Sequence, residues 1–249
     1  AGLRSQNLEM PEELNRIITD RISTILICPS QIAVNNLRKE GFPFSAPSKF
    51  QQTIINLGDV MLDATLHYRT IAHQRFSLES WNVDESSYAL CTLHRAENTN
   101  NTMRLKGILS ALREIATKVT VLLPLHPRTR KQIMKLAGQN WLNGIQVIDP
   151  VSYLEMQRLQ MSAKTILTDS GGIQKEAYFH RVPCLTLRDE TEWVETVAHG
   201  WNKIVGANPK NILYAWENPN GFQKKDIGEI YGKGNSAESI VGLLASTVV

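Results

Sequence analysis

The sequence predicts an α/β protein made of two Rossmann-like, doubly wound domains, of which the first is incomplete. From about residue 86, short apolar runs alternate with longer segments in which apolar residues recur at helical spacing. Such alternation is typical of repeated βαβ units, which form a parallel sheet covered by helices on both faces. The 249 residues exceed the ~150 of an average domain, and the first 80 contain only two strand-like runs.

The second domain, residues 81–230, contains the regular alternation. One apolar helical stripe runs through Leu105, Ile108, Leu112 and Ile115, and another begins at Tyr153. Because βαβ crossovers are right-handed, these segments predict one doubly wound, Rossmann-like sheet. The apolar runs that we interpret as its strands lie at residues 88–93, 119–123, 145–148, 165–167 and 183–187.

Residues 1–80 are interpreted as the C-terminal remnant of a first Rossmann-like domain plus a linker helix. Its two strands, at 24–28 and 53–57, cannot bury both faces of a parallel sheet, so the opening strands are missing. The polar stretch at 77–87 is the expected domain boundary. Helices are expected from Pro11 onward, over 31–40, over 60–76 as the linker, and over 236–244 near the end.

The composition excludes several classes of protein. The chain is 42% apolar and 20% charged, and no apolar run reaches the ~18 residues that span a bilayer, so no membrane partner is expected. A net charge of +3 with scattered basic residues argues against nucleic-acid binding. Three distant cysteines, each flanked by apolar residues, indicate reduced, buried thiols in a cytoplasmic protein. No His, Cys or Asp cluster has metal-ligand spacing, so neither a metal nor a cofactor is expected.

The sharpest motif is DSGGIQKEA at residues 169–177, where a strand runs directly into a helix. Such a bend points backbone N–H groups and the positive helix end at one spot, which suits a phosphate or diphosphate. Gly171 and Gly172 would let an anion approach the backbone. Ser170 would donate a hydrogen bond from its hydroxyl, and Glu176 would accept hydrogen bonds from ribose hydroxyls. A helix cap without any ligand fits this stretch equally well.

Two other strand ends carry a histidine close to an arginine. His94 and Arg95 follow the strand at 88–93, and His126 follows the strand at 119–123, two residues before Arg128. Loops at the carboxyl ends of parallel strands line the ligand crevice, so these side chains are placed to meet a charged substrate. A lone histidine more often satisfies a structural hydrogen bond, but two such ends beside an anion-binding bend favour a site. Residues 191–195 have capping-box character.

Taken in order, the motifs resemble those of the non-hydrolysing UDP-N-acetylglucosamine 2-epimerase family, and the resemblance covers nearly the whole chain. Ordered motifs at family-like spacing are far more specific than any one of them. The matching segments are AGLRS at 1–5, MPEELNR at 10–16, GDVM at 58–61, HRAEN at 94–98, HP at 126–127, DSGGIQKEA at 169–177, TEWVET at 191–196 and GWNKIVG at 200–206.

The resemblance implies a GT-B-like architecture, with the nucleotide in a cleft and a C-terminal helix, within residues 231–249, that crosses back to the first domain. It implies interconversion of UDP-GlcNAc and UDP-ManNAc, in which UDP is eliminated to leave a 2-acetamidoglucal and is then added again. Such products are precursors of surface polysaccharides. The resemblance also implies a UDP-sugar as the substrate and a homodimer of the full-length protein.

Site residues follow from the resemblance one position at a time. Glu12 matches a catalytic carboxylate and His94 the catalytic histidine, which we expect to face the bend at Ser170 across a gap between two lobes. The substrate-binding positions are Ser170, Gly171, Gly172 and Glu176 for UDP, Arg95 and His126 along the cleft, Arg188 at the diphosphate, and Met156 where many members pack an aromatic residue on uracil.

The chain departs from the family pattern in three places. Besides Met156, it has Trp193 and Val194 where some members have Arg-Pro, so a modified UDP-HexNAc substrate is an alternative. Family elements that precede Ala1 are absent, so we expect this chain to bind UDP weakly and not to turn over. A GT-B glycosyltransferase, a UDP-sugar-sensing module and a hydrolysing 2-epimerase are further alternatives.

Overall fold

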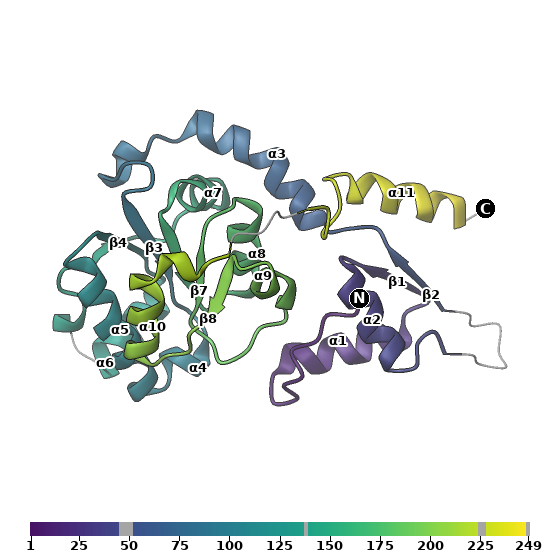
Figure 1. Ribbon diagram of the computed structural model, residues 1–249, viewed down its shortest axis with the longest axis horizontal. Helices are drawn as coiled ribbons and strands as arrows, with labels where there is room; N and C mark the ends of the chain where they lie inside the picture. The colour runs from purple at the N-terminus through teal and green to yellow at the C-terminus, as the bar shows by residue number, and fades with distance from the viewer. Residues whose placement is uncertain (45–51, 137–138, 224–227, 248–249) are drawn as a thin grey trace. The chain divides into compact units, whose positions relative to one another are not determined.

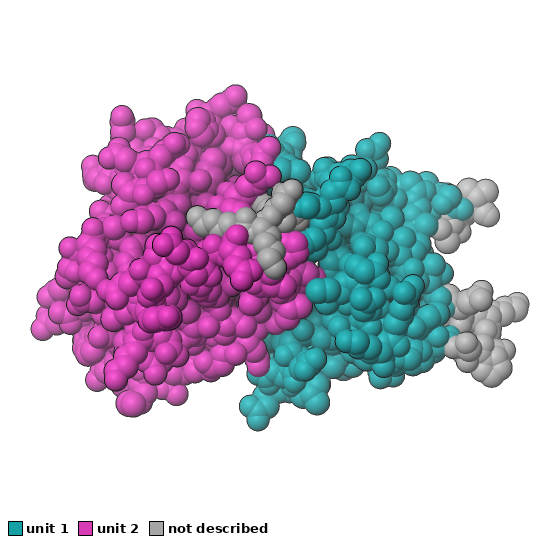
Figure 2. Space-filling model, viewed as in Figure 1, with its two compact units in different colours: residues 1–67, 228–249 teal, residues 68–227 magenta. Residues whose placement is uncertain are grey.

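The structure, a computed structural model, describes residues 1–44, 52–136, 139–223 and 228–247 and divides into two compact units (Figure 2). Unit 1 comprises Ala1–His67 and Gly228–Val249, and unit 2 comprises Tyr68–Ile227. The chain passes from unit 1 to unit 2 inside helix α3 (Val60–Arg75). The limits inferred from the sequence, at residues 80 and 230, stay predictions. In the described part of the chain, no helix has the length and apolar character of a membrane span.

A six-stranded parallel sheet forms the centre of unit 2 (Figure 1). Its spatial order is β5-β4-β3-β6-β7-β8, so the direction in which strands are added reverses between β3 and β6. This is the strand order of a doubly wound Rossmann sheet, which confirms the predicted fold of this region. The strands are β3 (Tyr88–Thr92), β4 (Thr120–Pro124), β5 (Gln146–Ile148), β6 (Thr165–Thr168), β7 (Cys184–Thr186) and β8 (Asn202–Ile204).

Helices cover both faces of this sheet, and each face has its own apolar core. Successive side chains of a strand point to opposite faces, so Ala89 and Cys91 of β3 pack with α5 and α10, whereas Tyr88 and Leu90 pack with α7 and α8. Figure 1 shows α5 and α10 side by side. The helices are α4 (Ala96–Thr99), α5 (Thr102–Ala116), α6 (Pro127–Leu136), α7 (Tyr153–Ser162), α8 (Gly171–Phe179), α9 (Val194–Ala198) and α10 (Pro209–Glu217), with 3-10 turns at Leu78–Trp81, Gln139–Leu142 and Pro219–Gly221.

Two local features of unit 2 differ from the sequence prediction. Strand β8 was not predicted because it lacks an apolar run; it forms by pairing with β7, and Asn202 accepts a 2.7 Å hydrogen bond from the Thr186 hydroxyl. The capping box expected at 191–195 is wrong. Helix α9 begins after Trp193 without a side-chain cap. The Thr191 hydroxyl accepts from the Trp193 amide at 3.1 Å, before the helix, and donates to Gln174 at 2.6 Å.

Unit 1 contains a two-stranded parallel sheet, as predicted for the remnant of an α/β domain. Its core gathers Leu26, Leu37, Phe42 and neighbouring apolar residues. The three cysteines of the chain are buried free thiols, which confirms their predicted burial. The elements of this unit are α1 (Pro11–Ile22), β1 (Ile25–Cys28), α2 (Gln31–Lys39), β2 (Thr53–Asn56), the first half of α3, and α11 (Ser236–Thr247).

Buried charges hold the first residues against α1 and α2. The Arg4 guanidinium lies 2.8 Å from Asp20 and 2.6 Å from Glu40, and the Gly2 amide donates to the same Asp20 carboxylate at 3.0 Å. Gly2 has φ +77°, and a Cβ there would overlap the Ala33 carbonyl oxygen. The AGLRS motif therefore contributes to the packing of unit 1.

The C-terminal residues 228–247 are attached to unit 1 around Gly58. The Asp59 amide donates to the Tyr231 carbonyl at 2.9 Å, and the Ala237 amide at the start of α11 donates to Asp63 at 2.6 Å. Gly58 has φ +80°, and a Cβ there would lie 2.6 Å from the Ser236 hydroxyl and 2.7 Å from the Tyr231 carbonyl. A side chain at this position is therefore incompatible with the attachment of α11.

The substitution Gly58→Ala tests this attachment. We expect it to lower the local stability of α11 by about 3 kcal/mol, the sum of left-handed backbone strain and overlap. Gly41→Ala is the matched control, because Gly41 has φ +85° but its nearest neighbour, Phe44, is 3.8 Å away; it should cost about 1 kcal/mol. Hydrogen exchange of the α11 amides is measured in both variants. Equal protection of α11 in Gly58→Ala and Gly41→Ala would contradict the attachment of α11 around Gly58.

Candidate functional site

The candidate site lies in unit 2, where the carboxyl ends of β3 and β6 meet. These neighbouring strands flank the point at which the strand order reverses. In doubly wound sheets, loops diverge at such a point and leave a crevice for a ligand. The two loops here carry the two sharpest motifs of the sequence, HRAEN and DSGGIQKEA.

A buried carboxylate, that of Asp169, joins the two loops. It accepts hydrogen bonds from the backbone amides of His94 (3.1 Å) and Arg95 (3.0 Å) and from the side-chain amide of Asn98 (3.2 Å). Asn98 also donates to the Leu187 carbonyl after β7, at 2.9 Å. The Asp169 side chain has no solvent exposure. One carboxylate thus fixes the ends of three adjacent strands.

The imidazole of His94 lies close to this carboxylate. Its Nε2 is 3.8 Å from Asp169 Oδ1, and the ring is half exposed. His94 and Ser170 both belong to unit 2, on loops that Asp169 connects directly. The expectation that a gap between two lobes separates them is therefore wrong: the parallel pairing of β3 with β6 puts both loops at one edge of one sheet.

Ser170 caps helix α8. Its Oγ accepts a long hydrogen bond, 3.5 Å, from the Ile173 amide, and its own amide donates to the Thr168 hydroxyl at 2.9 Å. The Thr168 and Thr92 hydroxyls are 2.6 Å apart, which adds a further link between β6 and β3. The predicted capping role is therefore present, and the positive end of the α8 dipole lies at the carboxyl end of β6.

Gly171 is required by the packing of the protein itself. A Cβ at this first residue of α8 would lie 2.5 Å from the Glu192 carboxylate and 3.3 Å from the Trp193 indole nitrogen. From the sequence, Gly171 is expected to let an anion approach the backbone. In the structure, the Glu192 carboxylate occupies the space beside its α-carbon. Glu192 in turn accepts a 2.9 Å hydrogen bond from Arg188, and both side chains are buried.

Glu176 is a buried carboxylate on α8. Its Oε2 accepts a 2.6 Å hydrogen bond from the side-chain amide of Gln160 on α7. Burial raises the pKa of Glu176, and the amides of Gln160 and Gln157 and the charge of Lys175 offset this only in part. A carboxylate kept in such surroundings is typical of a functional position.

The remaining predicted residues occupy different places. Met156 is partly buried against the α7/α8 core, and Arg95 lies in the β3 loop beside His94. His126 is exposed after β4, where its Nδ1 accepts from the Arg128 amide at 3.2 Å. Glu12 is exposed in the first turn of α1 and belongs to unit 1. The structure thus brings His94, Arg95, Ser170 and Gly171 to one edge, and it leaves the part of Glu12 a prediction.

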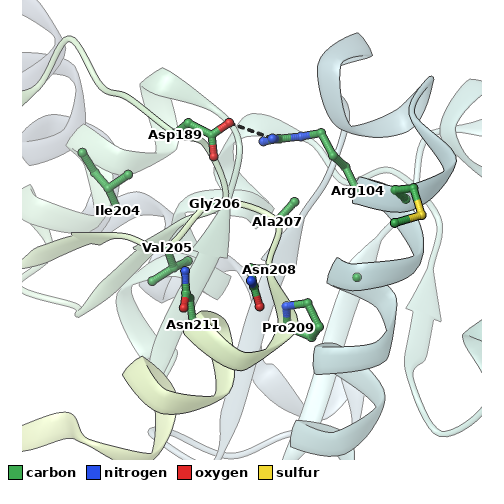
Figure 3. Close-up of a pocket in the computed structure, with 11 residues that line it drawn as sticks. Arg104, Asp189, Ile204, Val205, Gly206, Ala207, Asn208, Pro209 and Asn211 are labelled. Carbon is green, nitrogen blue, oxygen red and sulfur yellow. Dashed lines mark hydrogen bonds and ion pairs between the residues drawn. The ribbon is translucent and has the colours of Figure 1, made fainter.

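A pocket of about 540 Å³ lies beside the carboxyl ends of β7 and β8 (Figure 3). Arg104 of α5 borders it and donates to Asp189 at 2.7 Å, while Gly206 approaches Asp189 from the β8 loop. The pocket contains none of the predicted site residues, although the GWNKIVG segment at 200–206 contributes Ile204, Val205 and Gly206 to its lining. Arg104 also donates to Asn98 at 2.9 Å, so the pocket is linked to the hydrogen bonds around Asp169.

An open parallel sheet with a capped, amide-rich helix start at its point of strand reversal is the architecture of Rossmann-type domains. Comparison with known proteins narrows this class. Residues 1–245 match the family described as UDP-N-acetylglucosamine 2-epimerase. The chain belongs to this family, as its motifs predicted.

Individual relatives extend the match. A UDP-2,3-diacetamido-2,3-dideoxy-D-glucuronate 2-epimerase from Pseudomonas aeruginosa is 46% identical, over 98% of this chain and 66% of the relative. A UDP-N-acetylglucosamine 2-epimerase homolog from Methanococcus maripaludis is 45% identical, over 98% of this chain and 67% of the relative. The crystal structure of Methanocaldococcus jannaschii UDP-GlcNAc 2-epimerase with UDP-GlcNAc and UDP has TM-score 0.84 and 40% identity, over 99% of this chain and 67% of that one. The chain thus spans about two thirds of their length, and the GT-B-like fold class with an incomplete first domain is confirmed.

The substitution Asp169→Asn tests the central carboxylate. It removes the charge and turns an amide N–H₂ toward backbone donors, so we expect unit 2 to lose about 2 kcal/mol of stability. Asp189→Asn is the control, since the Asp189 carboxylate in the ion pair with Arg104 is largely exposed and should contribute less than about 0.5 kcal/mol. Urea unfolding followed by tryptophan fluorescence measures both. Equal losses would show that Asp169 is no more important than a surface charge.

The substitution Glu176→Gln should stabilise the protein at pH 7. A carboxyl whose folded pKa is raised opposes folding when ionised, and this penalty disappears as the pH falls through its folded pKa. We therefore expect a higher urea midpoint than wild type at neutral pH and no difference below the ordinary carboxyl range. Glu114→Gln, at an exposed position of α5, should leave the urea midpoint unchanged at both pH values. A loss of stability at pH 7 would contradict the assignment.

Proposed function

We propose that this chain supplies the UDP-binding unit and part of the catalytic machinery of a non-hydrolysing UDP-HexNAc 2-epimerase. The observation that carries the proposal is the junction of the loops after β3 and β6, where Asp169 fixes a histidine loop against an amide-rich helix start. The family membership and the crystal structure of a relative with UDP-GlcNAc and UDP support the same conclusion.

The proposed reaction begins with an elimination. A base removes the C2 proton, the C1–O bond to UDP breaks, and its electron pair leaves with the diphosphate, so that a 2-acetamidoglucal and UDP remain bound. UDP then adds again at C1, and C2 receives a proton on the opposite face. Because the C2 hydrogen is only weakly acidic, stabilisation of the departing diphosphate is the main catalytic task.

The residues of unit 2 suit this task. We assign the diphosphate to the α8 start, with the Ser170 hydroxyl and the amides of Gly171 and Gly172 as donors and Arg188 as a nearby cation. Glu176 accepts hydrogen bonds from the ribose hydroxyls, and Met156 lies beside the uracil ring. His94, half exposed beside a buried carboxylate, is placed to handle a proton. Arg95 and His126 line the approach, and Glu12 of unit 1 is the second proton-handling group.

Two substrates compete within this reaction class. UDP-GlcNAc is favoured by the names of most relatives, including those from Methanococcus maripaludis and Methanocaldococcus jannaschii. A UDP-2,3-diacetamido-glucuronate sugar is favoured by the 46% identical Pseudomonas aeruginosa relative and by the departures at Met156, Trp193 and Val194. The homodimer, the cytoplasmic location and the role in polysaccharide synthesis stay predictions.

The proposal predicts C2 deuteration in D₂O without any acceptor. A protein that also carries the part by which the relatives are longer should incorporate deuterium at C2 of one of the two UDP-sugars and form its C2 epimer. The 249-residue chain should bind UDP without turnover. Absence of exchange with both sugars would favour a glycosyltransferase or a sensing module, and accumulation of UDP with free sugar would favour a hydrolysing enzyme.

A further inference from the structure

The buried carboxylate of Glu176 has a short hydrogen bond to a neighbouring side chain. Gln160 of α7 and Glu176 of α8 are both at most 5% exposed, and the amide nitrogen of Gln160 donates to Glu176 Oε2 at 2.6 Å. An ionised carboxylate can only accept hydrogen bonds, so the N–H₂ end of the amide must face it. Gln160 engages Oε2 of the carboxylate, and the side chain of Gln157 is a second hydrogen-bond partner.

Besides Gln160, the side-chain amide of Gln157 acts on the carboxylate charge. Lys175 on the same helix acts on it through its charge, and His180 is turned to Gln157, with 2.7 Å between their polar atoms. Burial and the charge of Arg69 lower the pKa of His180 to about 4, so this ring is neutral at pH 7. No arginine, lysine or histidine forms an ion pair with Glu176 in the described part of the chain.

The amide of Gln160 is not fully satisfied by the fold. Its carbonyl oxygen is buried and has no hydrogen-bond partner among the described residues. An unpaired buried carbonyl costs free energy, and an apolar side chain would avoid that cost. The arrangement is therefore explained better by a task for the Gln160–Glu176 pair than by its contribution to stability.

The position of Glu176 on α8 indicates that task. It lies five residues after Gly171, about 7.5 Å along the helix axis at 1.5 Å per residue. The helix start is assigned to the diphosphate under the proposed function, and the ribose of a nucleotide follows its diphosphate. We propose that Gln160 is a positioning residue for nucleotide recognition: through its amide it orients the Glu176 carboxylate to accept the ribose hydroxyls of a uridine nucleotide. This inference rests on the proposed function.

The test compares UDP with 2′-deoxy-UDP in the 249-residue chain by calorimetric titration. Wild type should prefer UDP about tenfold, as expected for a hydrogen bond to a charged group. Gln160→Met keeps the length of the side chain but removes the amide, and it should bring the ratio of the two affinities close to one. In a Glu176→Gln background, Gln160→Met should have no further effect on that ratio.

Gln174→Met is the matched control. Gln174 is equally buried and also has an unpaired amide atom among the described residues, but its oxygen accepts from Thr191 and Asn202. This variant should lose stability and keep the wild-type preference for UDP. Gln160→Asn, whose shorter amide falls short of Glu176, serves in place of Gln160→Met if the latter does not fold, and the same loss of preference is expected.

The outcomes separate the inference from the proposed function. If wild type does not bind UDP, the proposed function fails. If wild type binds and prefers UDP while Gln160→Met keeps that preference, the positioning role is refuted and the proposed function stands. If Gln174→Met loses the preference as fully as Gln160→Met, the effect is one of general packing, and the positioning role is again refuted.

Discussion

The carboxylate of Asp169 joins three neighbouring strand ends in unit 2, and the arrangement of the loops at this edge of the sheet depends on it. It accepts hydrogen bonds from two backbone amides of the β3 loop, and Asn98 links it by hydrogen bonds to the loop after β7. A charge without exposure is tolerable only when donors surround it. Because those donors belong to the loops that bear His94 and Ser170, the bonds that stabilise the charge also fix the candidate site.

The polar groups behind α8 form a second layer of support. Thr186, Asn202, Gln174 and Thr191 are linked by buried hydrogen bonds that run from β7 and β8 to the helix. Apolar residues in the same positions would pack without these directional contacts. The network fixes α8 relative to the sheet, and with it the orientation of the helix start.

The sequence predicts the parts of this fold that depend on local pattern. Strands β3 and β6 are buried on both faces, so Tyr88–Thr92 and Thr165–Thr168 read as apolar runs between helical patterns. Strand β8 lies at the sheet edge with three residues, and its sequence carries no such pattern. The role of Asp169 depends on the pairing of β3 with β6, which joins residues more than 70 positions apart, and no local pattern contains that pairing. The same holds for Gly171: the sequence indicates a glycine turn, but only the folded chain reveals Glu192 as its neighbour.

The division of unit 1 into two segments has a consequence for biosynthesis. Gly58 packs against Tyr231 and Ser236, residues that a ribosome adds only after the whole of Tyr68–Ile227 has been made. Unit 2 is continuous in the chain, so its sheet can form while translation is still under way. Residues 1–67 are therefore made before unit 2 but belong to a unit that is completed after it, and until residues 228–247 have been added the carbonyl of Tyr231 and the helix that follows it are missing from its surface.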